Sequence, residues 1–413
     1  MGEPERLHRL RGRIELLLEQ TETLSDEKLM ALIEDIVVQD VDPEPLTANQ
    51  MVSAVRWLFH SFRGLDVLQP LVDDASISEI MVNRHDEIYI EREGKTSRFE
   101  GAFESQSKLE DIIQAIVSKV NRVVNEFSPI VDARLPDGSR VHVVLPPVAL
   151  KGPTLTIRKF PETPFSMEDL IAKGTLPKEA ASLLGCLIRA KYNLFISGGT
   201  GSGKTTFLNA LTAYIPEDER IVTIEDSAEL RIPTIPNLVS LETRNANTEG
   251  KGSITMRELI RASLRMRPNR IMVGEVRGAE ALDMLQAMNT GHEGSLSTGH
   301  ANSTADMLSR LETMTLSGSE LPLPVVRKQI ASALELIVQL SRMKDRSRKV
   351  VEIAEVVGMK EGDYVLNPLY VWKEEADDQG SGLVPTGNRL VHTEKLERAG
   401  IRITEGGAVH ASA

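Results

Sequence analysis

Gly198-Gly-Thr-Gly-Ser-Gly-Lys204-Thr205 is the stretch of this sequence that decides the fold. It fits the pattern G-x-x-x-x-G-K-[ST] at every fixed position. An apolar run at 193–197 stands directly before it, and a helix-forming run at 206–211 follows it. Because strand, loop and helix in this order are the context that the motif requires, the stretch predicts a phosphate-binding loop at the end of a buried strand.

Each residue type in this loop has a physical task. Glycines let backbone N–H groups turn toward a phosphate, and the N-terminus of the following helix adds positive potential. Lys204 is expected to neutralise β- and γ-phosphate oxygens, and Thr205 to bind Mg²⁺. The predicted nucleotide-binding residues of the loop are Gly198, Gly199, Thr200, Gly201, Ser202, Gly203, Lys204, Thr205 and Thr206.

A second apolar strand, at 270–275, ends in the carboxylate of Glu275. A phosphate-binding loop alone fits a kinase, a GTPase or a motor, so the acids that follow it decide between them. A carboxylate at the end of a neighbouring strand reaches the Mg²⁺ shell in such nucleotide hydrolases. A surface acid would look the same in isolation, but its position after the loop favours Glu275 as a metal-shell residue together with Thr205.

Around these two motifs, strands and helices alternate. Strands at 193–197, 221–225 and 270–275 with helices at 253–266 and 279–289 predict an open, mainly parallel sheet. The three runs that follow favour an antiparallel meander, at 336–342, 350–357 and 364–372. We therefore expect an α/β domain over 171–413, preceded by a proline-containing linker at 161–170.

The first 160 residues carry two other patterns. Apolar residues at three- to four-residue spacing predict a bundle of three helices over 1–66, with Ser25 and the Thr47/Gln50 pair as caps. An α+β domain is expected over 67–160, with a helix capped by Ser107 and strands at 79–83, 87–91, 97–99, 141–145 and 154–158. The bundle fits a packing appendage and a docking module equally well.

Composition excludes several classes of protein. There are 48 Lys+Arg against 60 Asp+Glu, giving a formal net charge of −12, and aromatic residues make up 4%. This balance argues against a DNA-driven motor, which needs a basic stripe or stacking rings. With Cys186 as the single cysteine, neither an internal disulfide nor a structural zinc site is expected. Since no apolar run reaches the ~20 residues of a membrane span and no signal peptide is recognisable, we expect a cytoplasmic protein.

Three further motifs carry a resemblance to a known family. They are Thr223-Ile-Glu-Asp-Ser-Ala-Glu229-Leu230, Leu264-Arg-Met-Arg-Pro-Asn-Arg270-Ile-Met-Val-Gly-Glu275-Val-Arg-Gly278 and Gly291-His-Glu-Gly-Ser-Leu-Ser-Thr-Gly-His300-Ala-Asn302. With the P-loop, and in this order, they resemble the secretion ATPases of type II and type IV systems. The runs 264–270 and 278–291 most resemble the CpaF/TadA branch, which drives tight-adherence pilus assembly.

The resemblance implies a fold, cofactors and catalytic roles. It implies a RecA-like P-loop ATPase domain behind a PAS-like α+β domain, with ATP and Mg²⁺ as cofactors. Glu229 would be the general base, Glu275 would hold Mg²⁺ through water, and His292 and His300 would sense the γ-phosphate. From the residues alone, Glu229 also fits a solvated acid, Glu225 and Asp226 share its candidacy, and an isolated histidine is more often a packing residue. Gly299 departs from the family, which has an aliphatic residue before the second histidine.

The resemblance also assigns three arginines. Segment 132–140 is similar to the part of the family's N-domain that reaches the γ-phosphate when the domains close, which implies Arg134 and Arg140 as closure switches. Arg158 would contact the nucleotide. Arg244, Arg267 and Arg277 lie near catalytic segments and receive no role of their own, because most arginines are surface charges.

As a whole, the resemblance implies a homohexameric motor at the cytoplasmic face of the inner membrane. ATP hydrolysis would drive assembly of a type IV or tight-adherence pilus through inner-membrane platform proteins, with retraction left open. Membrane association would be peripheral and through these partners, with no direct pilin or DNA binding. The alternatives are a conjugation- or effector-type secretion ATPase on the same fold, a DNA-stimulated RecA-like motor, and a non-hydrolysing scaffold, against which intact Lys204, Glu229 and Glu275 argue.

Overall fold

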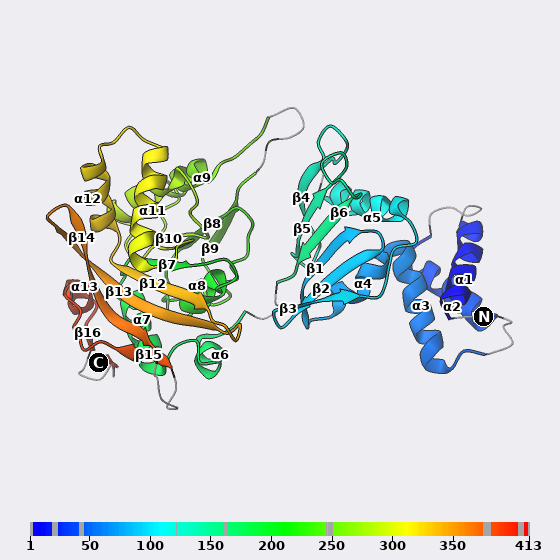
Figure 1. The fold of residues 1–413 in the computed structure, drawn as a ribbon, viewed down its shortest axis with the longest axis horizontal. Helices are drawn as coiled ribbons and strands as arrows, with labels where there is room; N and C mark the ends of the chain where they lie inside the picture. Colours follow the sequence, from blue (N-terminus) through cyan, green and yellow to red (C-terminus); the bar gives the residue numbers. More distant parts are fainter. Residues whose placement is uncertain are drawn as a thin grey trace. The chain divides into compact units, whose positions relative to one another are not determined.

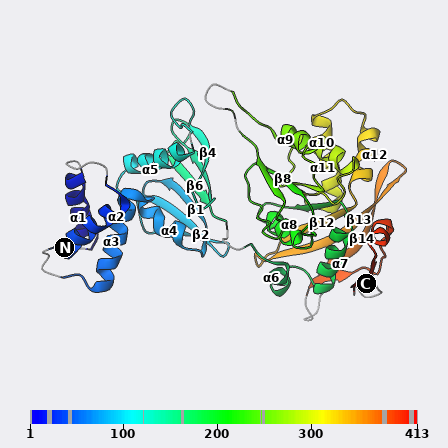
Figure 2. The same ribbon diagram turned by 180° about the vertical axis from the view of Figure 1, so that it is seen from behind.

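The computed structural model describes residues 3–18, 24–40, 45–120, 122–160, 164–244, 246, 251–374, 381–403 and 409–411. The chain forms two compact units, Met1–Pro161 and Glu162–Ala413, which run from blue to green and from green to red in Figure 1 and are seen from behind in Figure 2. In the described part of the chain, no helix is long and apolar enough to cross a bilayer.

The first unit begins with the three predicted helices, α1 (Glu3–Leu18), α2 (Asp26–Val38) and α3 (Ala48–Arg63). Ser25 caps α2, and Thr47 with Gln50 forms the capping box of α3, both as predicted. Apolar side chains of the three helices share one core, which includes Leu10, Ile14, Leu29, Ile33 and Leu58. A 3₁₀ turn (Asp66–Leu68) and α4 (Gln69–Asp73) lead from the bundle into a sheet. A domain boundary at residue 66 stays a prediction.

The sheet of the first unit is antiparallel, in the order β3-β2-β1-β6-β5-β4. Its strands are β1 (Ile77–Arg84), β2 (Glu87–Arg92), β3 (Lys95–Phe99), β4 (Ile130–Arg134), β5 (Arg140–Val144) and β6 (Thr154–Arg158). β4 was not predicted. Helix α5 (Gln106–Lys119) shares the sheet's apolar core. It begins earlier than predicted, because Ser105 rather than Ser107 is its N-cap and accepts the N–H of Lys108.

The second unit contains a nine-stranded sheet in the order β15-β14-β13-β12-β7-β11-β10-β8-β9. Neighbours from β12 to β9 are parallel; β12, β13 and β14 form the predicted antiparallel meander, which β15 extends by a fourth strand that was not predicted. The strands are β7 (Leu194–Gly198), β8 (Ile221–Glu225), β9 (Leu238–Glu242), β10 (Arg270–Val273), β11 (Leu296–Gly299), β12 (Leu336–Arg342), β13 (Arg348–Lys360), β14 (Asp363–Lys373) and β15 (Gly382–Pro385). β9 and β11 were not predicted.

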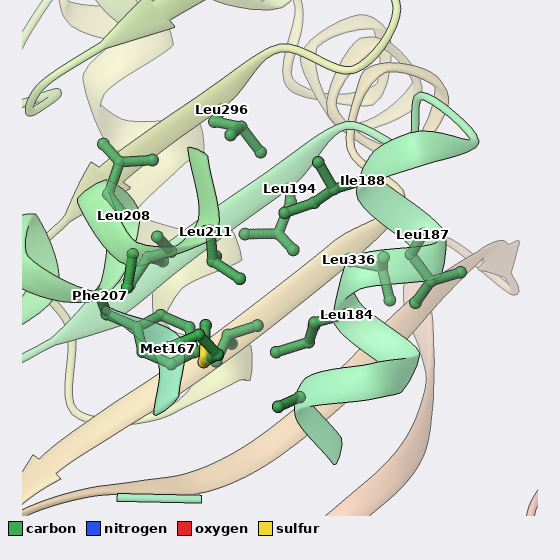
Figure 3. Packing of buried hydrophobic residues seen from close by; sticks show 14 of the residues in the cluster. Met167, Leu184, Leu187, Ile188, Leu194, Phe207, Leu208, Leu211, Leu296 and Leu336 are labelled. Atoms are coloured by element: carbon green, nitrogen blue, oxygen red, sulfur yellow. The ribbon is translucent and has the colours of Figure 1, made fainter. Parts of the chain in front are cut away.

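Helices cover both faces of this sheet. Successive strand residues point to opposite faces, and both faces carry apolar side chains that pack against helices. Leu194 and Ile196 pack with α6 (Met167–Ala172), α7 (Lys178–Arg189) and α8 (Lys204–Thr212), as Figure 3 shows for Leu194. Phe195 packs on the other face, among α9 (Met256–Ser263), α10 (Glu280–Asn289), α11 (Thr304–Ser317) and α12 (Leu323–Ala333). The chain continues through α13 (Glu394–Arg398) to a short pair, β16 (Ile401–Ile403) and β17 (Val409–Ala411).

Two consequences follow for the predicted organisation. α6 starts inside the expected linker at 161–170, where Ser166 and Asp169 form a capping box, and residues 161–163 of that linker lie outside the described residues. Because β7, β11, β10 and β8 are adjacent and parallel, their carboxyl ends meet at one edge of the sheet. In open α/β sheets this edge is where ligands bind.

Candidate functional site

The P-loop joins β7 to α8 in the strand–loop–helix order that the motif predicts. Gly201 and Gly203 have φ angles of 69° and 90°, a region that residues with a side chain rarely adopt. At Gly198, an added Cβ would lie 2.5 Å from Ser202 Oγ and 2.7 Å from the carbonyl oxygen of Leu340. The loop therefore needs glycine at these positions to keep its turn and its close approach to β12.

Lys204 is buried at the start of α8. Its Nζ donates to the carbonyl oxygens of Gly198, at 3.2 Å, and of Gly199, at 3.1 Å. The same Nζ lies 3.3 Å from Nδ1 of His300. Thr205 and Thr206 follow in the first turn of the helix, where both are partly exposed. The ammonium group thus lies at the mouth of the loop, held by the loop's own carbonyls.

His300 and Glu275 follow two neighbouring strands. His300 comes directly after β11, which lies between β7 and the strand β10 that leads to Glu275. Nε2 of His300 is 2.7 Å from Oε1 of Glu275. Arg277, which received no predicted role, donates from Nη2 to Oε2 of Glu275 at 2.6 Å. A continuous group, Lys204, His300, Glu275 and Arg277, therefore occupies the carboxyl edge of the sheet, and we call it the carboxyl-edge group.

The charges in this group are set by its neighbours. Burial alone would raise the pKa of Glu275, but the hydrogen bond from Arg277 and the nearby cations outweigh it and lower that pKa. Burial and the charge of Lys204 lower the pKa of His300, against the pull of Glu275. Glu275 is therefore an anion at neutral pH, and His300 is a neutral imidazole between a carboxylate and an ammonium group.

Glu229 lies in the loop that follows β8. The backbone N–H groups of Glu229 and Leu230 both donate to the carboxylate of Glu225, at 3.0 and 3.1 Å to Oε1. Asp226 Oδ2 is 3.8 Å from Nη1 of Arg277, and the charges of Asp226 and Glu229 both help to raise the pKa of Arg277, after that of Glu275. Arg277 therefore connects this loop to Glu275.

The residues present fit a Mg²⁺–nucleotide. Glu275 is bound through Oε2 by Arg277 and lies with Oε1 2.7 Å from Nε2 of His300; because an ionised carboxylate has about four lone-pair sites, it can still accept from a water of a Mg²⁺ shell. Among the residues that the structure describes, no three His, Cys, Asp or Glu gather into a metal site. Mg²⁺ would therefore be held by Thr205, by Glu275 through water and by nucleotide phosphates, which is how it usually binds in ATPases.

His292 lies at the other edge of the sheet. It precedes β11, whereas His300 follows it, and its Nδ1 is 3.2 Å from the carbonyl oxygen of Ala287. Asn193, at the start of β7, accepts the N–H groups of Gly294 and Ser295 through its Oδ1. The expectation that His292 senses the γ-phosphate at this chain's own P-loop does not fit that position, because the length of strand β11 separates the two histidines.

The three arginines predicted from the first 160 residues belong to the first unit and form a row. In register, Arg134 on β4 lies opposite Arg140 on β5, which lies opposite Arg158 on β6. Residues directly opposite in neighbouring strands share a face of the sheet. The preceding row, Ala133, Val141 and Ile157, belongs to the buried core. The arginine row therefore occupies the face opposite to that core, and its approach to a nucleotide stays a prediction.

Sequence reasoning missed two contacts at the site. Arg277 carried a signal, because it stands two residues after Glu275 in the same motif. Arg348 on β13 carried none: its Nε donates to the carbonyl oxygen of Gly201 at 3.3 Å, across 147 residues of chain. Only the meander that places β12 beside β7 brings this side chain to the P-loop.

The family described as "Type II/IV secretion system protein" matches residues 62–391. A putative conjugal transfer protein of Mycobacterium tuberculosis is 35% identical over 312 residues, covering 74% of this chain and 88% of the relative. The type IV secretion system protein VirB11 of Bartonella henselae is 32% identical, covering 70% and 91%. The specific likeness to the CpaF/TadA branch is not among these findings.

Solved structures share the fold. The pilus retraction motor PilT with bound ADP matches with a TM-score of 0.51 and 17% identity, covering 81% of this chain and 86% of that one. The Legionella pneumophila ATPase DotB matches with a TM-score of 0.50 and 22% identity, covering 78% and 84%. The predicted mixed α/β fold of this ATPase class is thereby confirmed.

Proposed function

This chain belongs to the family of type II/IV secretion system proteins, and we propose that it is an ATP-hydrolysing motor of that family. The observation that carries the proposal is the carboxyl-edge group beside the P-loop. A P-loop alone would bind a nucleotide, but an ionised Glu275, held by Arg277 and His300 and close to Lys204, supplies what phosphoryl transfer to water needs.

Each residue of the site has a task in this proposal. Lys204 and the P-loop N–H groups bind the β- and γ-phosphates, and Thr205 with Glu275 holds the shell of Mg²⁺, which would offset the charge that develops on the phosphates. Glu229 orients the attacking water and accepts its proton. His300, neutral between Lys204 and Glu275, reports the state of the γ-phosphate to β11.

The arginine row supports a second nucleotide contact. Arg134, Arg140 and Arg158 lie opposite one another in register, and Arg158 also lies opposite Glu79 on β1; three guanidinium groups gathered on one face can bind a phosphate through charge-assisted hydrogen bonds. We propose that this row reaches the γ-phosphate when the first unit closes on a nucleotide. Removing the charge with Arg134→Ala should weaken the compaction that ATP causes in small-angle scattering, and unchanged compaction would count against the role.

The assembly and the system served are finer proposals. We propose a homohexamer acting peripherally on inner-membrane platform proteins at the cytoplasmic face, in assembly of a tight-adherence pilus. The motifs at 264–270 and 278–291 support this choice, as does the helical bundle that begins before the family match at residue 62. A conjugal transfer motor is the second candidate, which the names of the relatives from Mycobacterium tuberculosis and Rhizobium radiobacter favour.

The test is phosphate release by the purified chain, together with its mass in solution with and without Mg²⁺-ATP. We expect turnover from a particle near six subunits, and no turnover in Glu275→Gln or Glu229→Gln, although both bind ATP. Wild-type turnover in either glutamate variant would remove that residue's role. Stimulation of turnover by DNA would favour a DNA-driven motor instead.

A further inference from the structure

Glu225 is a buried acid that the proposed chemistry leaves without a task. It ends β8, and its residue is 3% exposed. Sequence reasoning left open that Glu225 and Asp226 share the work of Glu229. The structure argues against that use of Glu225, because its Oε1 already accepts two backbone N–H groups, and Oε2 lies 3.4 Å from the second of them. With the residue 3% exposed, water has little access to this carboxylate.

Glu225 accepts the N–H groups of two consecutive loop residues, and the first of them is the proposed general base. The donors are Glu229 itself and Leu230, four and five residues further along the chain. Leu230 is buried in the core beneath α7 and α8. The side chain of Glu225 therefore ties the backbone of the loop 226–230 to the end of β8. It thereby fixes the backbone that carries the side chain of Glu229.

The neighbouring strand makes room for this arrangement. A Cβ added at Gly274 would lie 2.8 Å from Cγ of Glu225, closer than two carbon atoms tolerate. Gly274 directly precedes Glu275, and its N–H donates to the carbonyl oxygen of Ile224 at 2.9 Å. The glycine in the run Val273-Gly-Glu275 is thus needed for the packing of Glu225, and it couples the two catalytic segments.

We propose that Glu225 is the positioning residue for Glu229. The inference rests on the proposed function, in which Glu229 orients the attacking water. Glu225 takes no proton and touches no substrate; its carboxylate holds the Glu229 backbone at a fixed distance from Glu275 and the P-loop. Because a shift of about 1 Å at a reacting group can cost about a hundredfold in rate, this bond controls turnover without contributing to nucleotide binding.

The test compares Glu225→Met, which removes both acceptor oxygens at a similar side-chain length, with Glu355→Met, its matched control. Glu355 is 1% exposed and likewise accepts two consecutive backbone N–H groups, those of Val391 and His392, but on the meander away from the P-loop. Phosphate release is measured against ATP concentration, with thermal unfolding of each variant. We expect kcat of Glu225→Met to fall about tenfold to a hundredfold with KM unchanged, and Glu355→Met to keep its kcat at a comparable loss of Tm.

Two further variants separate the possible failures. Glu229→Gln removes the carboxylate of the general base and leaves the backbone bond to Glu225 in place, so it tests the general base separately from the positioning role. Glu225→Asp, which keeps the charge but withdraws it by one methylene, should also lose kcat, and it replaces Glu225→Met if that variant does not fold. Full turnover in a folded Glu225→Met overturns the positioning role alone. Full turnover in Glu229→Gln overturns the general base and this inference with it.

Discussion

The nine-stranded sheet has an amino edge, where its parallel strands begin, and a carboxyl edge, where they end, and the polar residues at these two edges have opposite roles. At the amino edge, the side chain of Arg270 is 0% exposed and pairs with both oxygens of Glu219, at 2.6 and 3.0 Å, while donating to the carbonyl oxygen of Ile188 at 2.7 Å. At the carboxyl edge, the side chains of Glu275 and His300 are 20% and 33% exposed, and the carboxylate of Glu275 keeps lone pairs beyond its contacts with Arg277 and His300.

The amino-edge pair therefore stabilises the fold, whereas the carboxyl-edge residues are available to a ligand. A buried ion pair whose groups are all satisfied has nothing left to offer a ligand, whereas an accessible site must hold unused capacity until a nucleotide arrives. Both edges draw on the same two motifs: Arg270 and Glu275 share one run, and Gly294 and His300 share the other. A Cβ at Gly294 would lie 2.5 Å from Nη1 of Arg270, so this glycine belongs to the amino edge as well.

The largest expected effect is on stability, at the amino edge. Arg270→Met leaves the buried carboxylate of Glu219 without its guanidinium, with Lys191 Nζ at 3.8 Å as the cation that remains, and should lower the free energy of unfolding by about 3–5 kcal/mol. Denaturant unfolding measures this. The double variant Arg270→Met/Glu219→Leu should recover much of the loss, and a single variant as stable as the wild type would contradict the comparison.

Lys204→Ala should have its effect on binding instead. Its ammonium group is the cation placed at the mouth of the P-loop, so its removal should weaken ATP binding by about 2–5 kcal/mol. The free energy of unfolding should change far less than in Arg270→Met, because the lost partners are neutral backbone carbonyls and not a buried carboxylate. Isothermal titration measures the loss of ATP affinity, and denaturant unfolding measures the change in stability. If Lys204→Ala and Arg270→Met were equally destabilised, the proposed difference between the two edges would be wrong.

Arg277→Gln should change the pH dependence of turnover. Arg277 lowers the pKa of Glu275, so without it the pKa rises and the carboxylate is protonated at a higher pH. If hydrolysis needs ionised Glu275, the acidic limb of the pH–rate profile moves toward neutral pH, and the variant loses more activity at pH 6 than at pH 8. A uniform loss at all pH values would assign Arg277 to nucleotide contact alone.

The smallest expected effect concerns His300. Its pKa is lowered in the folded state, so the unfolded chain binds the proton more readily and stability falls as the pH drops through the unfolded value, near about 6.5. His300→Gln should remove this contribution and flatten the stability profile between about pH 7 and 5. The site is partly exposed, so the change should be a fraction of that in Arg270→Met, and an unchanged slope would argue against a neutral His300.

Local signals predicted the site well where the chain itself supplies them. The P-loop, β7 and α8 are contiguous, and Glu275 follows an apolar strand, so sequence placed them correctly at strand ends. The Arg270–Glu219 pair was not predictable, because its members are 51 residues apart. β4 was missed because two of the five residues in Ile-Val-Asp-Ala-Arg134 are charged, and the segment forms a strand by pairing with β5. His292 and His300 looked equivalent in the motif, and only the strand between them assigns them to different edges.

The most direct test measures phosphate release per folded molecule for Glu275→Gln and Arg270→Met side by side, at a temperature where both are folded. The account predicts that Glu275→Gln is stable, binds ATP and releases no phosphate, whereas Arg270→Met is much less stable and releases phosphate at the wild-type rate. Turnover in Glu275→Gln, or a silent but folded Arg270→Met, would contradict the assignment of chemistry to the carboxyl edge and of stability to the amino edge.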